Sequence, residues 1–277
     1  MLDSRQLHDV PSGFRAANGN GWYGASVERM SDVANDMGKR EAPMIIEIIT
    51  LFPDGVRTIL NESILARAQR FGAVEIEYVQ LREFAEDKHS TVDDKPLGGG
   101  PGMVLKAEPL DKAFKQLVEK RPTPKPFVLF TSPQGRRLDQ SLVEELVLKP
   151  RLTILCGHYK GVDQRLLDRH IDMEVSIGDY ILTGGELPAA VIVDSVVRLL
   201  PGVLGDPESA AGDSFSRGLL DHPHYTQPAS WQGEEAPEVL LSGHHGNVEI
   251  WRQEQAVERT RALRPDLFEK WLAKLRK

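Results

Sequence analysis

Cysteine is nearly missing from this sequence of 277 residues, since Cys156 is its single example. An intramolecular disulfide is therefore excluded, and a reducing setting such as the cytoplasm fits best. No stretch of about 18 apolar residues occurs, so the sequence predicts no membrane-spanning helix. The first residues also lack the apolar core of about 7–15 residues that a secretory signal needs.

Two common nucleotide-binding motifs are missing as well. No GxGxxG follows a predicted strand and no GxxxxGK[ST] occurs, which removes the main support for a dinucleotide site or a P-loop. A basic surplus is also lacking, because 34 Lys and Arg residues stand against 41 Asp and Glu residues, for a formal charge of −7. This balance excludes a chain that coats nucleic acid over its whole surface, but it permits a local basic site.

Residues 1–43 differ from the rest of the chain. They are rich in glycine, carry acids and bases in near balance, and show no sustained hydrophobic period. Such a segment buries too little apolar surface to order itself. We predict a disordered N-terminal extension, or residues that precede the true start codon.

Apolar strand-like and helix-like segments alternate from Met44 onward. This alternation predicts an α/β fold with a mostly parallel sheet covered on both faces. The chain breaks the pattern at 201–218, and we assign 44–203 to the α/β domain, 204–219 to a mobile interdomain linker and 220–277 to a small helical domain. Strands or extended segments are expected at 45–49, 74–79, 127–130, 152–156 and 173–182, and helices at 56–70, 109–120, 138–148, 162–170, 188–200, 248–263 and 265–277.

Three of the predicted strands end in glycine-bearing loops, at Thr131–Gly135, Cys156–Gly161 and Ser176–Pro188. Ligands of parallel α/β sheets bind beyond the carboxyl ends of the strands, and glycine lets a ligand approach the main chain closely. The three loops therefore predict one ligand cleft, although glycines that only close tight turns would explain them about equally well. A fourth glycine run, Gly98–Gly102, has the composition of a flexible lid or of a plain solvated turn.

Several other side chains have simpler interpretations. Thr183 and Glu186 have the spacing of a helix capping box, and Cys156 has the setting of a small core residue. Histidines at 222, 224, 244 and 245 form two pairs without a supporting carboxylate or cysteine cluster, so we predict no metal ligands among them. From Trp251 to the last residue, eight bases face four acids, which permits a phosphate-facing surface or only a solvated helix face.

Eight motifs follow one another in a fixed order along the chain. They are Leu51-Phe52-Pro53, Asp93-Asp94-Lys95-Pro96, Gly98 to Met103, Ser132-Pro133-Gln134-Gly135-Arg136, Ser176 to Pro188, Pro201 to Gly205, Asp213-Ser214-Phe215 and Ser242-Gly243-His244-His245. Together they resemble the bacterial TrmD family of tRNA (guanine-N(1)-)-methyltransferases. The resemblance runs from about Met44 to the C-terminus and leaves residues 1–43 outside it.

The resemblance implies a SPOUT-type domain with a trefoil knot, which sequence reasoning alone would reject because knots are so rare. It also implies a homodimer, S-adenosyl-L-methionine (the methyl donor) in the knot loops, tRNA as the substrate and, in addition, a magnesium requirement. Position by position, the donor pocket would be lined by Ser132, Pro133, Gly157, Ile177, Gly178, Tyr180, Leu182, Gly184, Gly185 and Pro188.

The same resemblance implies that Asp213 and Arg198 act on the guanine just 3′ of the anticodon. A carboxylate can remove the N(1) proton, and a guanidinium can stabilise the charge that develops on the 6-oxo oxygen. On residue chemistry alone, Asp213 would be a turn-forming loop carboxylate and Arg198 an ion-pair partner of Asp194. Phe130 and Lys160 depart from the tyrosine and the glutamate that often occupy these positions, which puts donor affinity in question.

Two other functions remain open at this point. The chain could be a different SPOUT-like methyltransferase, which modifies a ribose hydroxyl or ribosomal RNA, or it could be a module that binds RNA or a nucleotide without catalysis. The first would not need the Asp213 segment or the C-terminal helices, and the second would not need both Arg198 and Asp213.

Overall fold

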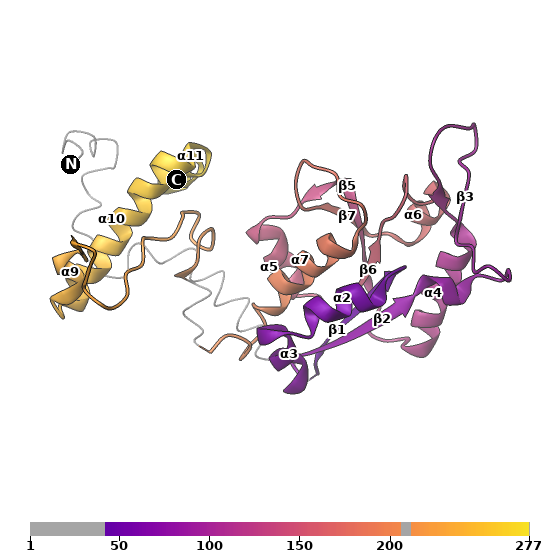
Figure 1. The fold of residues 1–277 in the computed structure, drawn as a ribbon, viewed down its shortest axis with the longest axis horizontal. Coiled ribbons are helices and arrows are strands. Elements are labelled where there is room, and N and C mark those ends of the chain that lie inside the picture. Colours follow the sequence, from indigo (N-terminus) through magenta and orange to yellow (C-terminus); the bar gives the residue numbers. More distant parts are fainter. Residues whose placement is uncertain (1–41, 206–211, 277) are drawn as a thin grey trace. The chain divides into compact units, whose positions relative to one another are not determined.

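The computed structural model describes residues 42–205 and 212–276. Contacts within the chain divide the described residues into two compact units, a larger one at 42–205 and a smaller one at 212–276 (Figure 1). The predicted disordered extension, 1–43, lies outside the described residues except for Ala42 and Pro43. Part of the predicted linker, 206–211, lies outside them too.

The larger unit contains the predicted parallel sheet. Its five strands run in the order β2-β1-β6-β5-β7, and every neighbouring pair is parallel. The strands are β1 (Met44–Thr50), β2 (Val74–Gln80), β5 (Phe127–Arg137), β6 (Arg151–Cys156) and β7 (Met173–Ser176). The fold class predicted from the alternation of elements, a parallel α/β sheet, is thereby confirmed.

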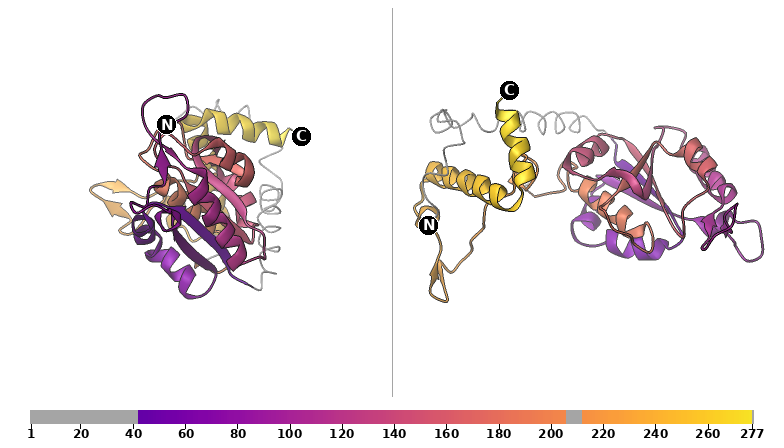
Figure 2. Two further views of the ribbon diagram at one scale, coloured as in Figure 1. Left: turned by 90° about the vertical axis from the view of Figure 1, so that its right-hand side faces the viewer. Right: turned by 90° about the horizontal axis from the view of Figure 1, so that it is seen from above.

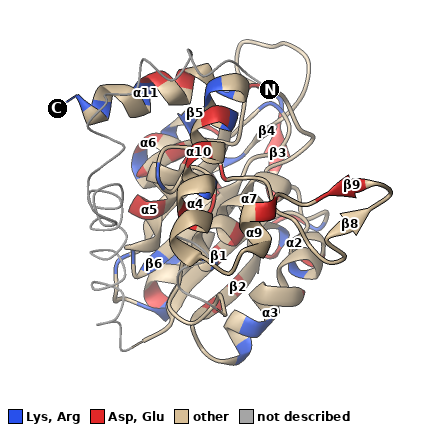
Figure 3. Ribbon diagram, turned by 90° about the vertical axis from the view of Figure 1, so that its left-hand side faces the viewer, with Lys and Arg blue, Asp and Glu red and all other residues tan. Residues whose placement is uncertain are grey.

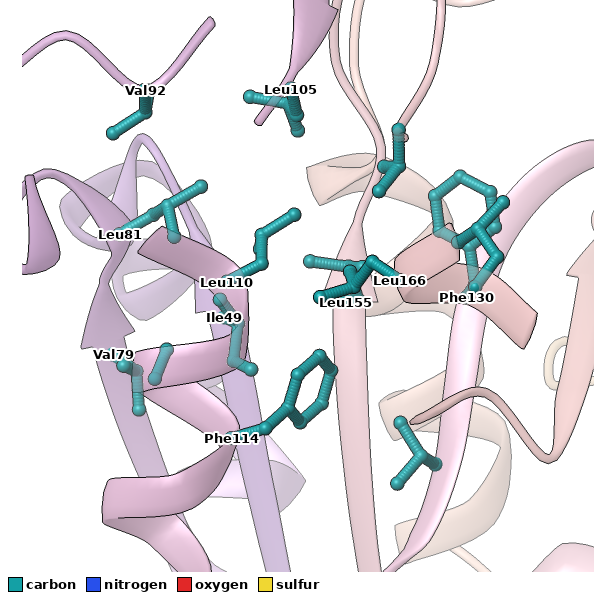
Figure 4. Close-up of a cluster of buried hydrophobic side chains, with 14 of the residues drawn as sticks. Ile49, Val79, Leu81, Val92, Leu105, Leu110, Phe114, Phe130, Leu155 and Leu166 are labelled. Carbon is teal, nitrogen blue, oxygen red and sulfur yellow. The ribbon is translucent and has the colours of Figure 1, made fainter. Parts of the chain in front are cut away.

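Helices cover both faces of this sheet, as the two views of Figure 2 show. One face is covered by α4 (Ala107–Lys120) and α6 (Gln164–His170), and the other by α2 (Pro53–Leu60), α3 (Ser63–Arg70), α5 (Gln140–Val147) and α7 (Glu186–Val197). Successive strand residues alternate between the two faces, so Ile49 packs toward α4 while Thr50 reaches α7. Figure 4 shows the core beneath α4, where Phe114 and Leu110 meet Ile49 and Leu155.

A buried ion pair lies between the central strands. The Arg151 guanidinium on β6 donates to both carboxylate oxygens of Glu47 on β1, with its shortest contact at 2.7 Å, and neither side chain is more than 1% exposed. Arg151 also donates to the carbonyl oxygens of Leu117 and Arg121, at the C-terminal end of α4, and Thr153 donates to Glu47. The pair thus joins two strands and satisfies helix-end carbonyls that would otherwise be buried without partners.

The predicted helix at 56–70 is wrong, because two helices, α2 and α3, occupy this stretch. Asn61 ends α2, and the buried positions shift from Val56 and Leu60 to Leu65 and Ala68. Leu60 and Leu65 are five residues apart, whereas side chains on one face of a helix are three or four apart. One continuous helix would therefore not place all four side chains on the same buried face. Ile59 and Ile64 are 46% and 40% exposed, so they lie outside the buried face.

Three short elements were not predicted in the larger unit. A 3-10 turn, η3 (Leu81–Phe84), follows β2, and β3 (Asp93–Asp94) pairs with β4 (Val104–Leu105) in an antiparallel ribbon. The predicted extended segment at 173–182 is a strand only as far as Ser176.

The smaller unit is built on two helices, α10 (His245–Leu263) and α11 (Pro265–Leu275), close to the predicted bounds. It also contains α9 (Glu238–Leu241) and a ribbon of β8 (Ser230–Trp231) with β9 (Glu234–Glu235). Residues from the end of the predicted linker fold onto these helices, because Leu219 packs on the Val257–Phe268–Trp271 cluster and the Leu220 amide donates to Thr260 Oγ1 at 2.8 Å. In the described part of the chain, no helix is both long enough and apolar enough to cross a membrane.

Candidate active site

The three glycine-bearing loops meet at one edge of the sheet. Two of them follow β6 and β7, whereas Thr131–Gly135, which was expected to follow a strand ending at Phe130, is an irregular stretch inside β5. Because β5 lies between β6 and β7, all three stretches come together at this edge. Together they line an open cavity of about 520 Å³. The prediction that three separate loops form one cleft therefore agrees with the structure, and the fourth glycine run borders it through a contact described below.

All ten residues that the resemblance places around the methyl donor line this cavity. Ser132 and Pro133 come from the irregular stretch of β5, Gly157 from the β6 loop, six residues from the segment between β7 and α7, and Pro188 from the first turn of α7. Lys160 and Glu174 bring a positive and a negative side chain to the same cavity, while Leu167 and Val162 add apolar surface. A cavity of this size, with a few polar groups on a largely aliphatic and main-chain lining, suits a small molecule with both apolar and charged parts.

Gly185 shows why this site depends on glycine. Its amide donates to the Gly157 carbonyl oxygen at 2.7 Å, which ties the β7 loop to the β6 loop. A side chain at Gly185 would collide with the Thr131 hydroxyl and the Gly157 amide. The loops consequently approach one another at backbone distance, and alanine at 185 would push them apart.

A histidine and a glutamate hold the back of the same cavity. His158 Nε2 lies 2.8 Å from Glu186 Oε2, and the Thr50 hydroxyl donates to Glu186 Oε1 at 2.5 Å, so three segments far apart in sequence are joined. The two side chains are 13% and 16% exposed, and the ring of Phe52 packs on His158 at 5.2 Å between centroids. This cluster fixes the β6 loop against the start of α7.

The predicted capping box of Thr183 and Glu186 is wrong. The helix begins at Glu186 itself, its N-cap is Gly185, and no side chain caps it. Glu186 turns instead to His158 and Thr50. Sequence reasoning missed this cluster because its three members stand 28 to 136 residues apart, and the local signal was only a histidine, His158, within a glycine-bearing loop.

Two hydroxyl groups fix the loops internally. Thr131 Oγ1 accepts from the Gly157 amide at 3.1 Å and donates to the Leu155 carbonyl, and Ser176 Oγ bonds both the amide and the carbonyl of Gly178. These bonds shape the cavity before any ligand binds.

The glycine run at Gly98–Gly102 adjoins the cavity through Lys160. The Lys160 amide donates to the Met103 carbonyl at 2.9 Å, and a side chain at Gly102 would press on the Lys160 stem. Four glycines of the run have positive φ angles between 80° and 113°, a region that other residues rarely adopt. Its role as a lid stays a prediction.

Cys156 lies beneath the cavity and is buried, as its strand setting predicted. Burial raises the pKa of its thiol well above the ordinary value, and the nearby Glu186 carboxylate acts in the same direction. The thiol therefore stays protonated at neutral pH and is a poor nucleophile.

The expected catalytic pair is divided between the two units. Arg198 is the C-cap of α7 in the larger unit and is partly buried. Asp213 lies at the start of the smaller unit, in a turn where the Ser216 amide donates to its carbonyl oxygen at 3.3 Å. Each side chain is described within its own unit, so the pairing of the two stays a prediction.

The sequence was then compared with known proteins. The family described as "tRNA (Guanine-1)-methyltransferase TrmD" matches residues 44–270, which is most of the chain. The chain belongs to the TrmD family. The resemblance seen in the eight motifs is thereby confirmed, and the start of the match coincides with the first residue of β1.

Curated relatives in the TrmD family agree with this assignment. A tRNA (guanine-N(1)-)-methyltransferase of Ruminiclostridium cellulolyticum is 49% identical over 82% of this chain and 97% of that protein. The enzymes of the same name from Moorella thermoacetica and Anoxybacillus flavithermus are 51% and 52% identical, over 81% and 82% of this chain and 90% and 92% of theirs. Because the match spans both units, it relates the cavity and the C-terminal helices to the same enzyme family.

Proposed function

We propose that this chain transfers a methyl group from S-adenosylmethionine to N(1) of the guanine immediately 3′ of the anticodon in tRNA, in the cytoplasm. The observation that carries the proposal is the cavity, because all ten residues expected around the donor line it. Membership of the TrmD family supports the tRNA substrate and the N(1) position. We also infer that the β5, β6 and β7 loops form the knot of a SPOUT fold.

The donor would bind among the three loops. Main-chain groups of the glycine loops suit hydrogen bonding to the adenine and ribose edges, and the aliphatic side chains suit the adenine faces. Phe130, in place of a tyrosine, lines the cavity without a hydroxyl group, and Lys160 brings a positive charge where a carboxylate would attract the donor's ammonium group. We therefore expect weaker donor binding than in a relative with the usual pair.

The chemical step needs a base, because N(1) of guanine carries a proton at neutral pH. The Asp213 carboxylate would take this proton while N(1) attacks the sulfonium methyl group, whose bond to sulfur breaks as the new bond forms. The Arg198 guanidinium would stabilise the negative charge on the 6-oxo oxygen. In the described part of the chain, the group of three or more potential metal ligands is two histidines with one carboxylate, which is not the oxygen donor set that Mg²⁺ prefers. The magnesium requirement therefore stays a prediction, and no step uses the ion.

The role of Asp213 can be tested by removing its charge. Asp213→Asn keeps the size of the side chain but cannot accept the proton, so single-turnover methyl transfer at saturating tRNA should fall by about 10²–10⁴-fold. Arg198→Lys should also slow this step, because a point charge does not reproduce the guanidinium fork. Calorimetry should show unchanged donor binding in Asp213→Asn, and a near-normal saturated rate would remove Asp213 from the mechanism.

Nucleoside analysis separates the proposed reaction from its alternatives. Digested product tRNA should contain 1-methylguanosine only when guanine follows the anticodon. A ribose-methylated nucleoside would indicate another SPOUT-like enzyme, and no labelled product at all would indicate a binding module.

We further propose that two chains form a homodimer through the face of α7 and α2. Six residues of α7 are buried within the unit, yet Leu187 and Val191, one helical turn apart, are 53% and 45% exposed. Ile59 on α2, which packs beside α7, and Phe52 are exposed as well. Adjacent exposed apolar side chains of this kind mark an interface.

Light scattering at micromolar concentration should give the mass of two chains. Val191→Glu should produce monomers that fold but do not methylate tRNA, whereas Val118→Glu, at an exposed valine of α4 on the other face, should stay dimeric. A monomer with normal activity would contradict a shared active site.

A further inference from the structure

The segment Asp221-His222-Pro223-His224 gathers three metal-ligating side chains. One ligand atom from each of Asp221, His222 and His224 lies within 4.8 Å of the other two. The His224 Nε2 atom is 2.9 Å from Asp221 Oδ2, and the His222 Nε2 atom is 3.7 Å from Asp221 Oδ1. The histidine pair was visible in the sequence, but the structure adds that the two rings lie 4.4 Å apart between centroids and that each has its Nε2 atom near the Asp221 carboxylate.

The hydrogen bond on the other side of His222 determines what its Nε2 atom can do. His222 Nδ1 lies 3.0 Å from the Pro223 carbonyl oxygen. A carbonyl oxygen only accepts, so Nδ1 carries a proton, and Nε2 is the ring nitrogen through which His222 could bind a metal ion. Metal-binding histidines are typically oriented in this way by a carbonyl or carboxylate on the second ring nitrogen.

His222 Nε2 lies 3.7 Å from Asp221 Oδ1, which is too long for a hydrogen bond. Two ligands of a tetrahedral zinc ion, each about 2.0–2.1 Å from the metal, lie about 3.3 Å apart. The observed separations of 2.9 and 3.7 Å lie on either side of this value. The shorter distance runs to Oδ2 of Asp221 and the longer one to Oδ1, so the carboxylate would bind the ion through both oxygens or turn to present one of them to both rings.

The peptide backbone around the cluster is anchored. The Asp221 amide donates to Ser214 Oγ at 2.9 Å, the preceding Leu220 amide donates to Thr260 on α10, and the His222 amide donates to Asp221 Oδ1. The ring of Trp251 stands 6.3 Å from that of His222. The side chains of Asp221 and His222 are 27% and 17% exposed, whereas that of His224 is 70% exposed, so an ion could enter from the His224 side.

We propose that Asp221, His222 and His224 bind one divalent transition-metal ion, best Zn²⁺, with water completing the coordination. Two imidazoles and one carboxylate suit Zn²⁺, Co²⁺ or Ni²⁺ far better than Mg²⁺, which prefers oxygen ligands. On binding, His224 would carry its proton on Nδ1 and ligate through Nε2, so the neutral ring keeps its single proton. The Asp221–His224 hydrogen bond is replaced by two metal bonds.

Such an ion would hold the segment after Asp213 in one conformation. Ser214, next to Asp213, is bonded to the Asp221 amide, and the ion would fix Asp221 to both histidines. The site would therefore act as a clamp on the turn that carries Asp213, independent of donor binding in the larger unit.

The test uses the full-length chain, stripped of metal with a chelator and then titrated with Co²⁺ and Zn²⁺. Co²⁺ should develop visible d–d absorption bands at one ion per chain, Zn²⁺ should abolish them, and excess Mg²⁺ should not. His224→Gln and His222→Asn should each weaken binding by at least about tenfold, because even the loss of an outer-sphere partner costs about 10–100-fold.

His245→Asn serves as the matched control, because His245 is an exposed histidine of the same unit that lies outside the cluster. It should bind Co²⁺ as the original chain does. His224 is largely exposed, so His224→Gln should retain the fold, which circular dichroism would verify. The absence of Co²⁺ binding at micromolar concentration, or equal binding by His224→Gln and His245→Asn, would overturn the proposal and leave a hydrogen-bonded turn.

Discussion

The two units differ sharply in how much they bury. In the larger unit, side chains on both faces of five parallel strands are buried, and β1 and β6 are buried along nearly their whole length. In the described part of the smaller unit, the buried apolar side chains are Val257, Phe268 and Trp271. Stability rises with buried apolar area, so the larger unit holds its cavity rigid while the smaller one opens at lower cost.

This contrast fits a division of labour in the proposed reaction. Loops fixed by Thr131, Gly185 and Glu186 can bind a small donor without rearrangement, which keeps the entropic cost of binding low. The smaller unit carries Asp213, and Figure 3 shows Lys and Arg together with Asp and Glu on its helices. Lys274 lies in the last turn of α11 and Arg276 caps that helix. A lightly packed unit can adapt to a large RNA surface at little cost in packing.

The largest effect is expected from the buried ion pair of the larger unit. Arg151→Met would leave Glu47 buried without its partner and should lower the free energy of unfolding by about 3–5 kcal/mol, measured by urea denaturation. Arg136→Met breaks the exposed pair with Glu145 and should cost less than about 1 kcal/mol. Similar losses in the free energy of unfolding of the two variants would mean that burial does not determine how much an ion pair matters to the stability of this unit.

The next effect concerns the small core. Trp271→Ala removes the largest of its buried side chains and should destabilise the smaller unit by about 3 kcal/mol. Hydrogen exchange should rise in α10 and α11, while exchange in β1 and β6 and donor binding stay unchanged. Trp231→Ala, at a 63% exposed tryptophan of the same unit, should change neither. Increased exchange in the sheet of Trp271→Ala would show that the units fold as one.

The smallest effect is expected from the N-terminal residues. A chain that starts at Met44 should keep the melting temperature and the methyl-transfer rate of the full chain, because the family match begins there. A clear loss of either property on removal of 1–43 would show that these residues contribute to stability or activity. The two units would then not account for the enzyme by themselves.

Sequence reasoning predicted the elements that depend on local pattern. The strand at 45–49 and the helix at 109–120 carry strong periodicity, and both are present within two residues of their expected bounds. The break between α2 and α3 was missed because Asn61 and Glu62 carry no glycine or proline signal. The start of a new helix is associated with tertiary packing, because Leu65 of α3 is buried.

The candidate site was predictable to the same degree. The positions of the glycines in the sequence predicted the three loops. At Gly185 the structure gives the reason, because neighbouring segments come so close that a side chain would not fit. The cluster of Thr50, His158 and Glu186 could not be predicted, because it depends on which strands are neighbours. Neither could the approach of His222 and His224 to the Asp221 carboxylate, which depends on the shape of one turn.

The strand order also has a consequence for synthesis on the ribosome. β1 pairs with β6, which is complete only at Cys156, so one side of β1 lacks its neighbour while about a hundred residues are made, a wait of about 5–20 s at typical elongation rates. The apolar sequence of β1, MIIEIIT, would expose an unpaired strand edge during this time, and such an edge can pair with other chains. Glu47 places a charge at the centre of this strand. Until Arg151 emerges, that charge discourages pairing with other nascent chains. The carboxylate that is costly to bury in the finished enzyme thus protects the unfinished one.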